Sequence, residues 1–146
     1  MQNCRPDPGF RFFRFSLISM KAIKGKGVKV LITCFIRYTV NPEKLDDFEL
    51  YARTWMRLIE QYGGTHHGYY LPDSGAPPAA FSFPDIGEEG PYNIAVALFS
   101  FPSVEAYESY RREVSHDPEC QAITKHREET KPFTRYERTF VKSIER

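Results

Sequence analysis

The stretch Gly63-Gly64-Thr65-His66-His67-Gly68-Tyr69-Tyr70-Leu71-Pro72 divides the chain into its predicted helices and strands. Gly63 and Gly64 can adopt the positive φ angles that end a helix. The residues from Thr65 to Leu71 are mostly β-branched or aromatic and predict a short strand. The stretch therefore marks the point where a helix gives way to a strand.

An amphipathic helix is predicted just before this stretch. Asn41 is suited to cap the free N–H groups at the start of the helix, and Pro42 fits its first position, where a missing donor costs nothing. Apolar residues then recur at spacings of three and four and form one stripe: Leu45, Phe48, Ala52, Trp55, Ile59 and Tyr62. We interpret this stripe, Trp55 included, as core.

A strand is predicted before that helix, from Val28 to Val40. Both of its faces are largely apolar. One face would carry Ile32, Cys34, Ile36, Tyr38 and Val40, and the other Leu31, Thr33, Phe35, Arg37 and Thr39. We therefore expect both sides of the sheet to be covered.

The second half of the chain repeats this alternation of strand and helix. Its predicted elements are a strand at Tyr92–Phe101, a helix opening at Pro102-Ser103 with Tyr107, Tyr110 and Val114 on one side, a helix from Asp117-Pro118 to about Glu129, and a strand at Phe133–Ile144. The order β-α-β-β-α-(α)-β predicts an α+β protein with a ferredoxin-like β-α-β-β-α-β protomer.

Two stretches, at residues 63–72 and at 97–111 (ALFSFPSVEAYESYR), resemble the NIPSNAP family. The resemblance covers about residues 30 to 144. It implies a single-domain protein of the bacterial type, with residues 29–146 forming a NIPSNAP-like dimeric α/β-barrel domain. In such a barrel the four-stranded sheets of two protomers close on each other, with the helices outside. The two apolar faces of the first strand agree with this, and we expect a homodimer.

The charge distribution separates the first residues from the rest. Residues 1–30 hold seven basic side chains and one acidic one, a net charge of +6, whereas residues 31–146 hold 13 basic and 18 acidic ones, a net charge of −5. We predict a disordered basic leader at residues 1–28 and a cytoplasmic protein. The alternative is a mitochondrial location, with the leader as a presequence, which its Arg and Ser content would suit.

Several partner and cofactor classes lack support in the sequence. The mildly acidic body predicts no nucleic-acid partner, and the chain has no run of about 18 apolar residues that would predict a membrane span. Motifs for nucleotide binding, serine hydrolysis and zinc peptidase activity are missing, and Cys4, Cys34 and Cys120 have no zinc-ligand spacing. We expect no cofactor and no metal site.

A long connection rich in proline and glycine follows the strand, from Pro72 to Pro91. Within it, residues 79–85 nearly repeat the sequence of residues 97–103. We expect this connection to fold down as an apolar flap, and plain disorder is the alternative.

His66 and His67 are the candidate catalytic residues. Neighbouring side chains on a strand point to opposite faces, so at most one of the two faces the interior of a barrel. A neutral imidazole there is able to act as a general base near pH 7. The alternative is that one histidine is a packing residue and the other lies on the surface.

Four further residues are candidates for substrate binding. Arg37 lies on the mixed face of the first strand, and Glu137 on the last strand is a suitable partner for its guanidinium. The pair would orient an anionic or phenolic substrate, or would act as a structural clamp. Tyr69 and Tyr70 lie on opposite faces, so one of them would reach the cavity with its hydroxyl.

Three functions remain open from the sequence. The first is a barrel of unassigned activity that binds a small apolar or aromatic molecule as its ligand. The second is a cofactor-free monooxygenase or isomerase that acts on an aromatic or lactone substrate, with one of the histidines as base. The third is a protein-interaction module whose barrel is filled by Phe35, Tyr69 and Phe99. Whether the protein is an enzyme stays open, because this fold supports many chemistries.

Overall fold

The structure, a computed structural model, describes residues 31–75, 77 and 80–146. The predicted leader at residues 1–28 lies outside the described residues. The elements in chain order are β1 (Ile32–Val40), a short 3-10 helix η1 (Pro42–Lys44), α1 (Leu45–Gln61), β2 (Thr65–Tyr70), β3 (Ile94–Phe101), α2 (Val104–Val114), α3 (Pro118–Thr130) and β4 (Phe133–Val141).

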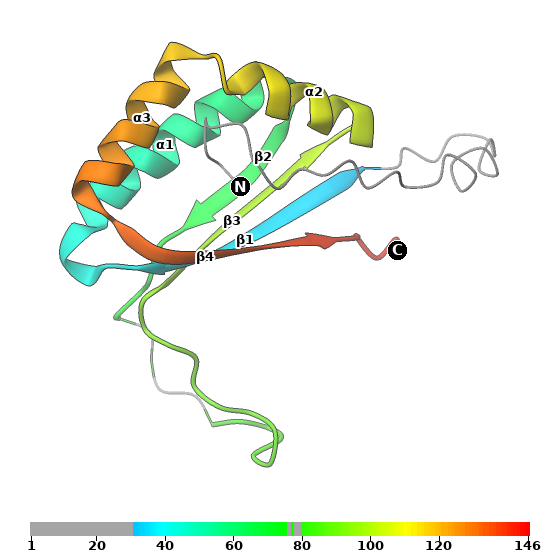
Figure 1. Ribbon diagram of the computed structural model, residues 1–146. Helices are drawn as coiled ribbons and strands as arrows, with labels where there is room; N and C mark the ends of the chain where they lie inside the picture. The colour runs from blue at the N-terminus through cyan, green and yellow to red at the C-terminus, as the bar shows by residue number, and fades with distance from the viewer. Residues whose placement is uncertain (1–30, 76, 78–79) are drawn as a thin grey trace.

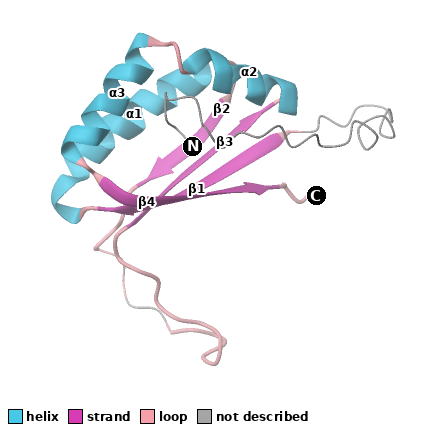
Figure 2. Ribbon diagram, in the orientation of Figure 1, coloured by secondary structure: helices cyan, strands magenta, loops and turns pink. Residues whose placement is uncertain are grey.

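The four strands form one antiparallel sheet in the order β2-β3-β1-β4. The three helices all lie on one face of this sheet, and none lies on the other (Figures 1 and 2). The predicted α+β class and the order of its elements are therefore confirmed. None of the described helices covers the second face of the sheet, which we call the uncovered face.

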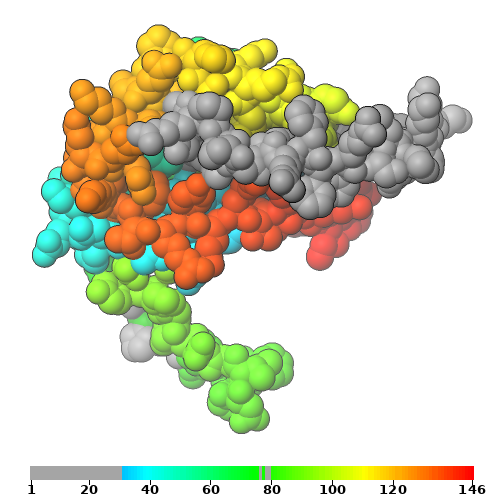
Figure 3. All heavy atoms as spheres, viewed as in Figure 1, coloured from blue at the N-terminus to red at the C-terminus, as the bar shows by residue number. Residues whose placement is uncertain are grey.

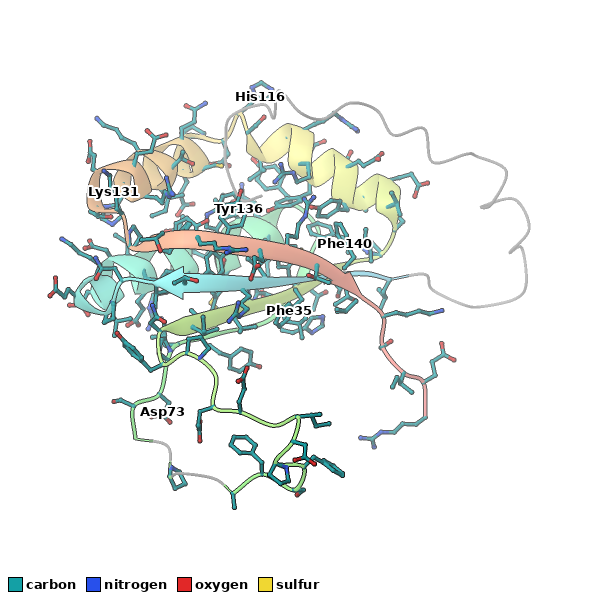
Figure 4. The ribbon with its side chains drawn as sticks, turned by 60° about the horizontal axis from the view of Figure 1, so that its bottom comes forward. Phe35, Asp73, His116, Lys131, Tyr136 and Phe140 are labelled. Carbon is teal, nitrogen blue, oxygen red and sulfur yellow. The ribbon has the colours of Figure 1, made fainter. Side chains whose placement is uncertain are left out.

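The alternation of side chains along β1 decides which residues form the core. Cys34, Ile36, Tyr38 and Val40 share one face, as predicted, and the structure places that face under the helices. The intervening residues lie on the uncovered face and are only partly buried: Thr33, Phe35, Arg37 and Thr39. Figure 4 shows Phe35 on this uncovered side, whereas Tyr136 and Phe140 of β4 lie toward the helices.

The helical segment starts at the predicted cap Asn41, but its first residues form η1 and α1 itself begins at Leu45; α1 ends just before Gly63 and Gly64, as predicted. The side chain of Asn41 accepts a hydrogen bond from the backbone N–H of Glu43 at 3.1 Å, although the first turn after it is a 3-10 helix and not α-helical. The predicted stripe packs on the sheet, and Tyr51 and Leu58 are buried with it.

The two glycines after α1, Gly63 and Gly64, have different structural roles. Gly63 has a φ of +92°, which makes it the residue that turns the chain out of the helix. Gly64 is needed for close packing, because a Cβ atom there would lie 2.7 Å from both Ile59 Cγ2 and Phe101 Cζ. The pair thus turns the chain and brings α1 against the start of β2.

Helices α2 and α3 also begin at the predicted caps. Ser103 accepts from the N–H of Ala106 at 3.0 Å, and Asp117 accepts from the N–H of Glu119 at 2.8 Å. The three residues predicted to lie on one side of α2 are buried: Tyr107, Tyr110 and Val114. No helix of the described residues is long and apolar enough to cross a membrane.

The connection between β2 and β3 extends away from the domain on the side opposite the helices (Figures 1 and 3). Phe83 is 71% exposed and Ile86 is 84% exposed, so these residues do not pack on the sheet. A short turn, in which Phe83 C=O accepts from Ile86 and Gly87 N–H, orders its tip. The prediction of an apolar flap folded onto the domain is therefore wrong for the described residues 80–91.

Candidate functional site

The predicted site residues are divided between the two faces of the sheet. The register pairs His66 with Phe99 and Tyr69 with Ala97, and both of these β3 residues are buried under the helices. Tyr70 pairs with Val96, whose side chain lies on the uncovered face. The division arises from a β-bulge between His66 and Gly68, which leaves His67 as the extra residue.

One row of side chains crosses the uncovered face from edge to edge. Tyr70 pairs with Val96, Val96 with Arg37, and Arg37 with Glu137. Tyr70 is 58% exposed, so its ring is open to a ligand or to a partner molecule. Three of the four predicted substrate-binding residues, Arg37, Tyr70 and Glu137, therefore lie in this single row.

The contact between Arg37 and Glu137 has the predicted partners. Arg37 Nη1 donates to Glu137 Oε2 at 3.0 Å, and Arg135 Nη2 donates to the other carboxylate oxygen, Oε1, at 2.8 Å. The hydrogen bond from Arg37, with the charge of Arg135 beside it, holds the pKa of the Glu137 carboxyl below its usual value. Since two guanidinium groups share one carboxylate, this margin of the face carries a net positive charge.

A second polar group lies at the other end of the same face. His67 Nε2 lies 2.8 Å from the hydroxyl oxygen of Ser100. Ser100 is only 4% exposed, and its side chain points to the face opposite to that of Phe99 and Phe101, which point to the helices. The sequence analysis missed both Ser100 and Arg135. A signal for Ser100 existed, because a polar residue interrupts an otherwise apolar strand.

The middle of the uncovered face is apolar. Phe35 on β1 pairs with Leu98 on β3, and Val96 lies one step further along β3 on the same side. All three are only partly buried in the protomer. The face thus has an apolar centre with hydrogen-bonding groups at both margins.

His66 and Tyr69 lie on the opposite side, under the helices. Their rings stack with centroids 5.0 Å apart, and Tyr69 hydroxyl lies 3.1 Å from that of Tyr38. His66 Nδ1 accepts from Gly68 N–H at 3.0 Å, so the proton of the neutral ring is on Nε2. Burial, with His67 nearby, lowers the pKa of His66 to about 4, which keeps it neutral at pH 7.

The described residues contain no group of three or more His, Cys, Asp or Glu side chains placed to hold a metal ion. Cys34 is a free cysteine, and it is buried beneath the helices. Burial raises the pKa of its thiol to about 11, so it is not an activated nucleophile.

The order β-α-β-β-α-α-β, with the described helices on one face of a four-stranded antiparallel sheet, defines the class of ferredoxin-like α+β proteins. Within this class the NIPSNAP family model matches residues 33–145. The chain belongs to the NIPSNAP family, as its resemblance at residues 63–72 and 97–111 predicted. No curated protein matches the sequence.

Solved structures of bacterial NIPSNAP proteins have the same fold. An uncharacterised NIPSNAP-like domain protein from Burkholderia xenovorans is 17% identical with a TM-score of 0.56, over 80% of this chain and 88% of that chain. A NIPSNAP family protein of unknown function from Agrobacterium tumefaciens is 14% identical with a TM-score of 0.58, over 80% and 91%. A second NIPSNAP family protein from that organism is 14% identical with a TM-score of 0.58, over 78% and 93%. At these identities the similarity establishes the fold alone.

Proposed function

We propose that the protein is a homodimer in which the uncovered sheet faces of two copies close into one barrel that binds a small apolar or aromatic molecule. The observation that carries this proposal is the bare face itself, with Phe35, Val96 and Leu98 at its centre. An apolar sheet face needs a covering layer, and a second copy supplies one with the same shape and pattern.

The distribution of polar groups supports a ligand between the two sheets. Arg37, Arg135 and Glu137 form a hydrogen-bonded cluster at one margin, and His67 and Ser100 form a pair at the other. Apolar pockets with a few polar groups at fixed positions are typical of small-molecule sites. In this proposal Arg37 orients a polar group of the ligand and Tyr70 forms part of the wall.

The protein-interaction alternative loses support from the packing. It required Phe35, Tyr69 and Phe99 to fill the space between the two sheets. Phe99 is 2% exposed and lies under the helices, and Tyr69 packs there beside Tyr38. Of the three rings only Phe35 points to the side where a partner sheet would lie.

The enzyme alternative has one specific observation in its favour. His67 lies on the same face as Arg37, with Ser100 hydrogen-bonded to its Nε2. In this version His67 acts as base and Arg37 orients an aromatic or lactone substrate. His66 has no such access, because it lies on the other side of the sheet. Equal turnover of a true substrate by H67A, R37A and wild type would exclude these roles.

Light scattering after size-exclusion chromatography on the full-length chain tests the dimer. Phe35→Glu places a carboxylate at the apolar centre of the face, which we expect to convert the dimer to a monomer. Leu50→Glu is the matched control, because Leu50 is 50% exposed on α1 and lies far from that face. A monomeric wild type at micromolar concentration, or a dimer that F35E leaves intact, would refute the proposed interface.

Native and then denaturing mass spectrometry of the same samples tests the ligand. We expect a dimer with an additional small-molecule mass that is released on unfolding, and no such mass on the F35E monomer. A dimer that carries no bound molecule, alone or with added aromatic compounds, would favour the interaction module instead.

A cytoplasmic location belongs to the same proposal. Fluorescence microscopy of a fusion with a fluorescent protein, with and without residues 1–28, distinguishes it from a mitochondrial location.

A further inference from the structure

A second polar cluster lies on the helix-facing side of the sheet, where side chains of α2 and β4 meet. Arg138 Nη1 on β4 donates to the hydroxyl of Tyr107 on α2 at 2.9 Å. The guanidinium of Arg138 lies 5.0 Å from the ring centroid of Phe140, and the Tyr107 ring meets that ring edge-on at 5.6 Å. The register pairs Arg138 with Ile36 and Phe140 with Cys34, so both side chains point to the helix side. Figure 4 shows Phe140 on that side.

The cluster contains two cations, and the described residues place no counter-ion beside them. Arg111 follows Tyr107 by four residues on α2 and so lies on the same side of the helix. Burial raises the pKa of both Tyr107 and Cys34, and the positive charges of Arg138 and Arg111 oppose this increase at both groups. Neither arginine forms an ion pair with a carboxylate of the described residues.

Two hydroxyl groups in this region also lack acceptors. Tyr110 is 1% exposed, and its hydroxyl has no hydrogen-bond partner among the described residues. The Tyr110 ring lies 6.0 Å from that of Tyr107, and the charge of Arg111 acts against the burial that raises the pKa of Tyr110. The Tyr107 oxygen accepts from Arg138, which leaves its own proton free to donate. Buried polar groups are normally paired, so the two tyrosine hydroxyls point to a missing acceptor, and the exposed guanidinium of Arg138 is accessible to one from solvent.

We propose that this cluster is a binding site for a small organic anion, whose oxyanion group is held by Arg138, Arg111 and the Tyr107 hydroxyl and whose apolar part lies against Phe140. Planar guanidinium groups match the geometry of carboxylate and phosphate oxygens. Phe140 is 46% exposed, so part of its ring is open to a ligand.

An external anion fits better than a covering segment of the same chain. The leader, residues 1–30, carries seven basic side chains and one acidic one, so it would add to the positive charge. The site is also separate from the proposed barrel, because Phe140 and Phe35 lie on opposite faces of the sheet. The F35E variant should therefore bind the anion as wild type does, which makes the two proposals fail independently.

Benzoate and benzamide are the matched probes, since they have nearly the same shape and differ in charge. We expect titration of the full-length protein, followed by NMR of the arginine side-chain N–H groups, to show saturable binding of benzoate and none of benzamide at equal concentration. Arg138→Gln should weaken benzoate binding by about tenfold, because it removes a hydrogen bond to a charged group. Arg138→Lys should recover part of the loss, since it keeps the charge without the planar fork.

Arg112→Gln is the control variant, because Arg112 is an exposed neighbour on α2 that contacts Ser109 and not the cluster. It should leave benzoate affinity within about twofold, since surface charges are well screened. Equal affinity in wild type and R138Q, equal losses in R138Q and R112Q, or equal binding of benzamide would each overturn the proposal. So would the absence of saturable binding by both benzoate and inorganic phosphate. Thermal melts of each variant check that it folds.

Discussion

The buried position of His66 predicts how stability changes with pH. Its imidazole stacks on Tyr69 and Phe99, and burial lowers its pKa from 6.5 to about 4. In the unfolded chain the ring takes up a proton near pH 6.5, whereas in the folded chain it does so only near pH 4. The unfolded state therefore binds more protons between these values, and stability must fall as the pH is lowered through that window.

The magnitude follows from the same two values. A pKa difference of one unit is about 1.4 kcal/mol, so full expression of the difference from 6.5 to about 4 would be about 3 kcal/mol. The ring is only partly buried, and solvent screening reduces this to about 1–2 kcal/mol. This contribution is fully present above pH 6.5 and is lost by about pH 4.

His66→Phe is the variant that isolates this effect. It keeps an aromatic ring in the stack, removes the buried Nε2–H that has no partner, and removes the acceptor for Gly68 N–H. Those constant terms change stability equally at every pH. We expect the difference in unfolding free energy between wild type and H66F to shift by about 1–2 kcal/mol between pH 7 and pH 4, in favour of the variant at low pH.

Urea unfolding at several pH values measures this shift. Protein concentration must be held fixed, because a dimer adds a concentration term to the unfolding free energy. His67→Gln is the control, since His67 is exposed on the other face. A pH-independent difference between wild type and H66F, or a shift of the same size in H67Q, would refute the reasoning.

Three further predictions concern packing and capping. Gly64→Ala should lower the free energy of unfolding by about 1–3 kcal/mol in thermal or urea unfolding, because the new Cβ would lie 2.7 Å from two side-chain atoms. Gly90→Ala is the control and should be close to neutral, because nothing lies within 4 Å of its Cβ position. Asp117→Ala should cost about 1 kcal/mol at pH 7, because it removes the cap of α3, and a variant as stable as wild type would exclude that role. Tyr110→Phe in the ligand-free protein should be neutral or stabilising by about 1 kcal/mol, since it removes a buried hydroxyl that has no partner in the described residues; a clear loss of stability would reveal an acceptor.

The fold was predictable because local signals agreed with the tertiary structure. The apolar spacing of α1, the caps at Ser103 and Asp117, and the alternation along β1 each depend on residues close together in sequence. The placement of the 72–91 connection was not predictable in this way. Its apolar residues suggested a packed flap, but local composition does not specify which surface, if any, a long loop contacts.

The candidate site was predictable only in part, and the reason is a single inserted residue. Strict alternation would place His67 and Tyr69 on one face and His66 and Tyr70 on the other. The bulge at His67 reverses the second half of β2, so that His66 and Tyr69 share the helix side. Gly68, with a φ of +146°, permits that backbone, but a glycine in a strand does not by itself specify a bulge. The pairing of Arg37 with Glu137 was predictable because both strands are regular around those positions.

The bulge also explains how one short strand serves both layers of the molecule. Because His66 and Tyr69 face the helices, their rings extend the aromatic core that includes Tyr38 and Phe99. Because His67 reaches Ser100 and Tyr70 stays exposed, the same strand also supplies polar and aromatic groups to the uncovered face. A strand without the bulge would also place one histidine and one tyrosine on each face, but it would pair His66 with Tyr70 and His67 with Tyr69. It would expose Tyr69 with His67 and bury Tyr70 with His66, so Tyr38 would lose its contact with the Tyr69 hydroxyl. The backbone at His67 and Gly68 therefore determines which chemistry faces a partner or ligand and which stays in the core.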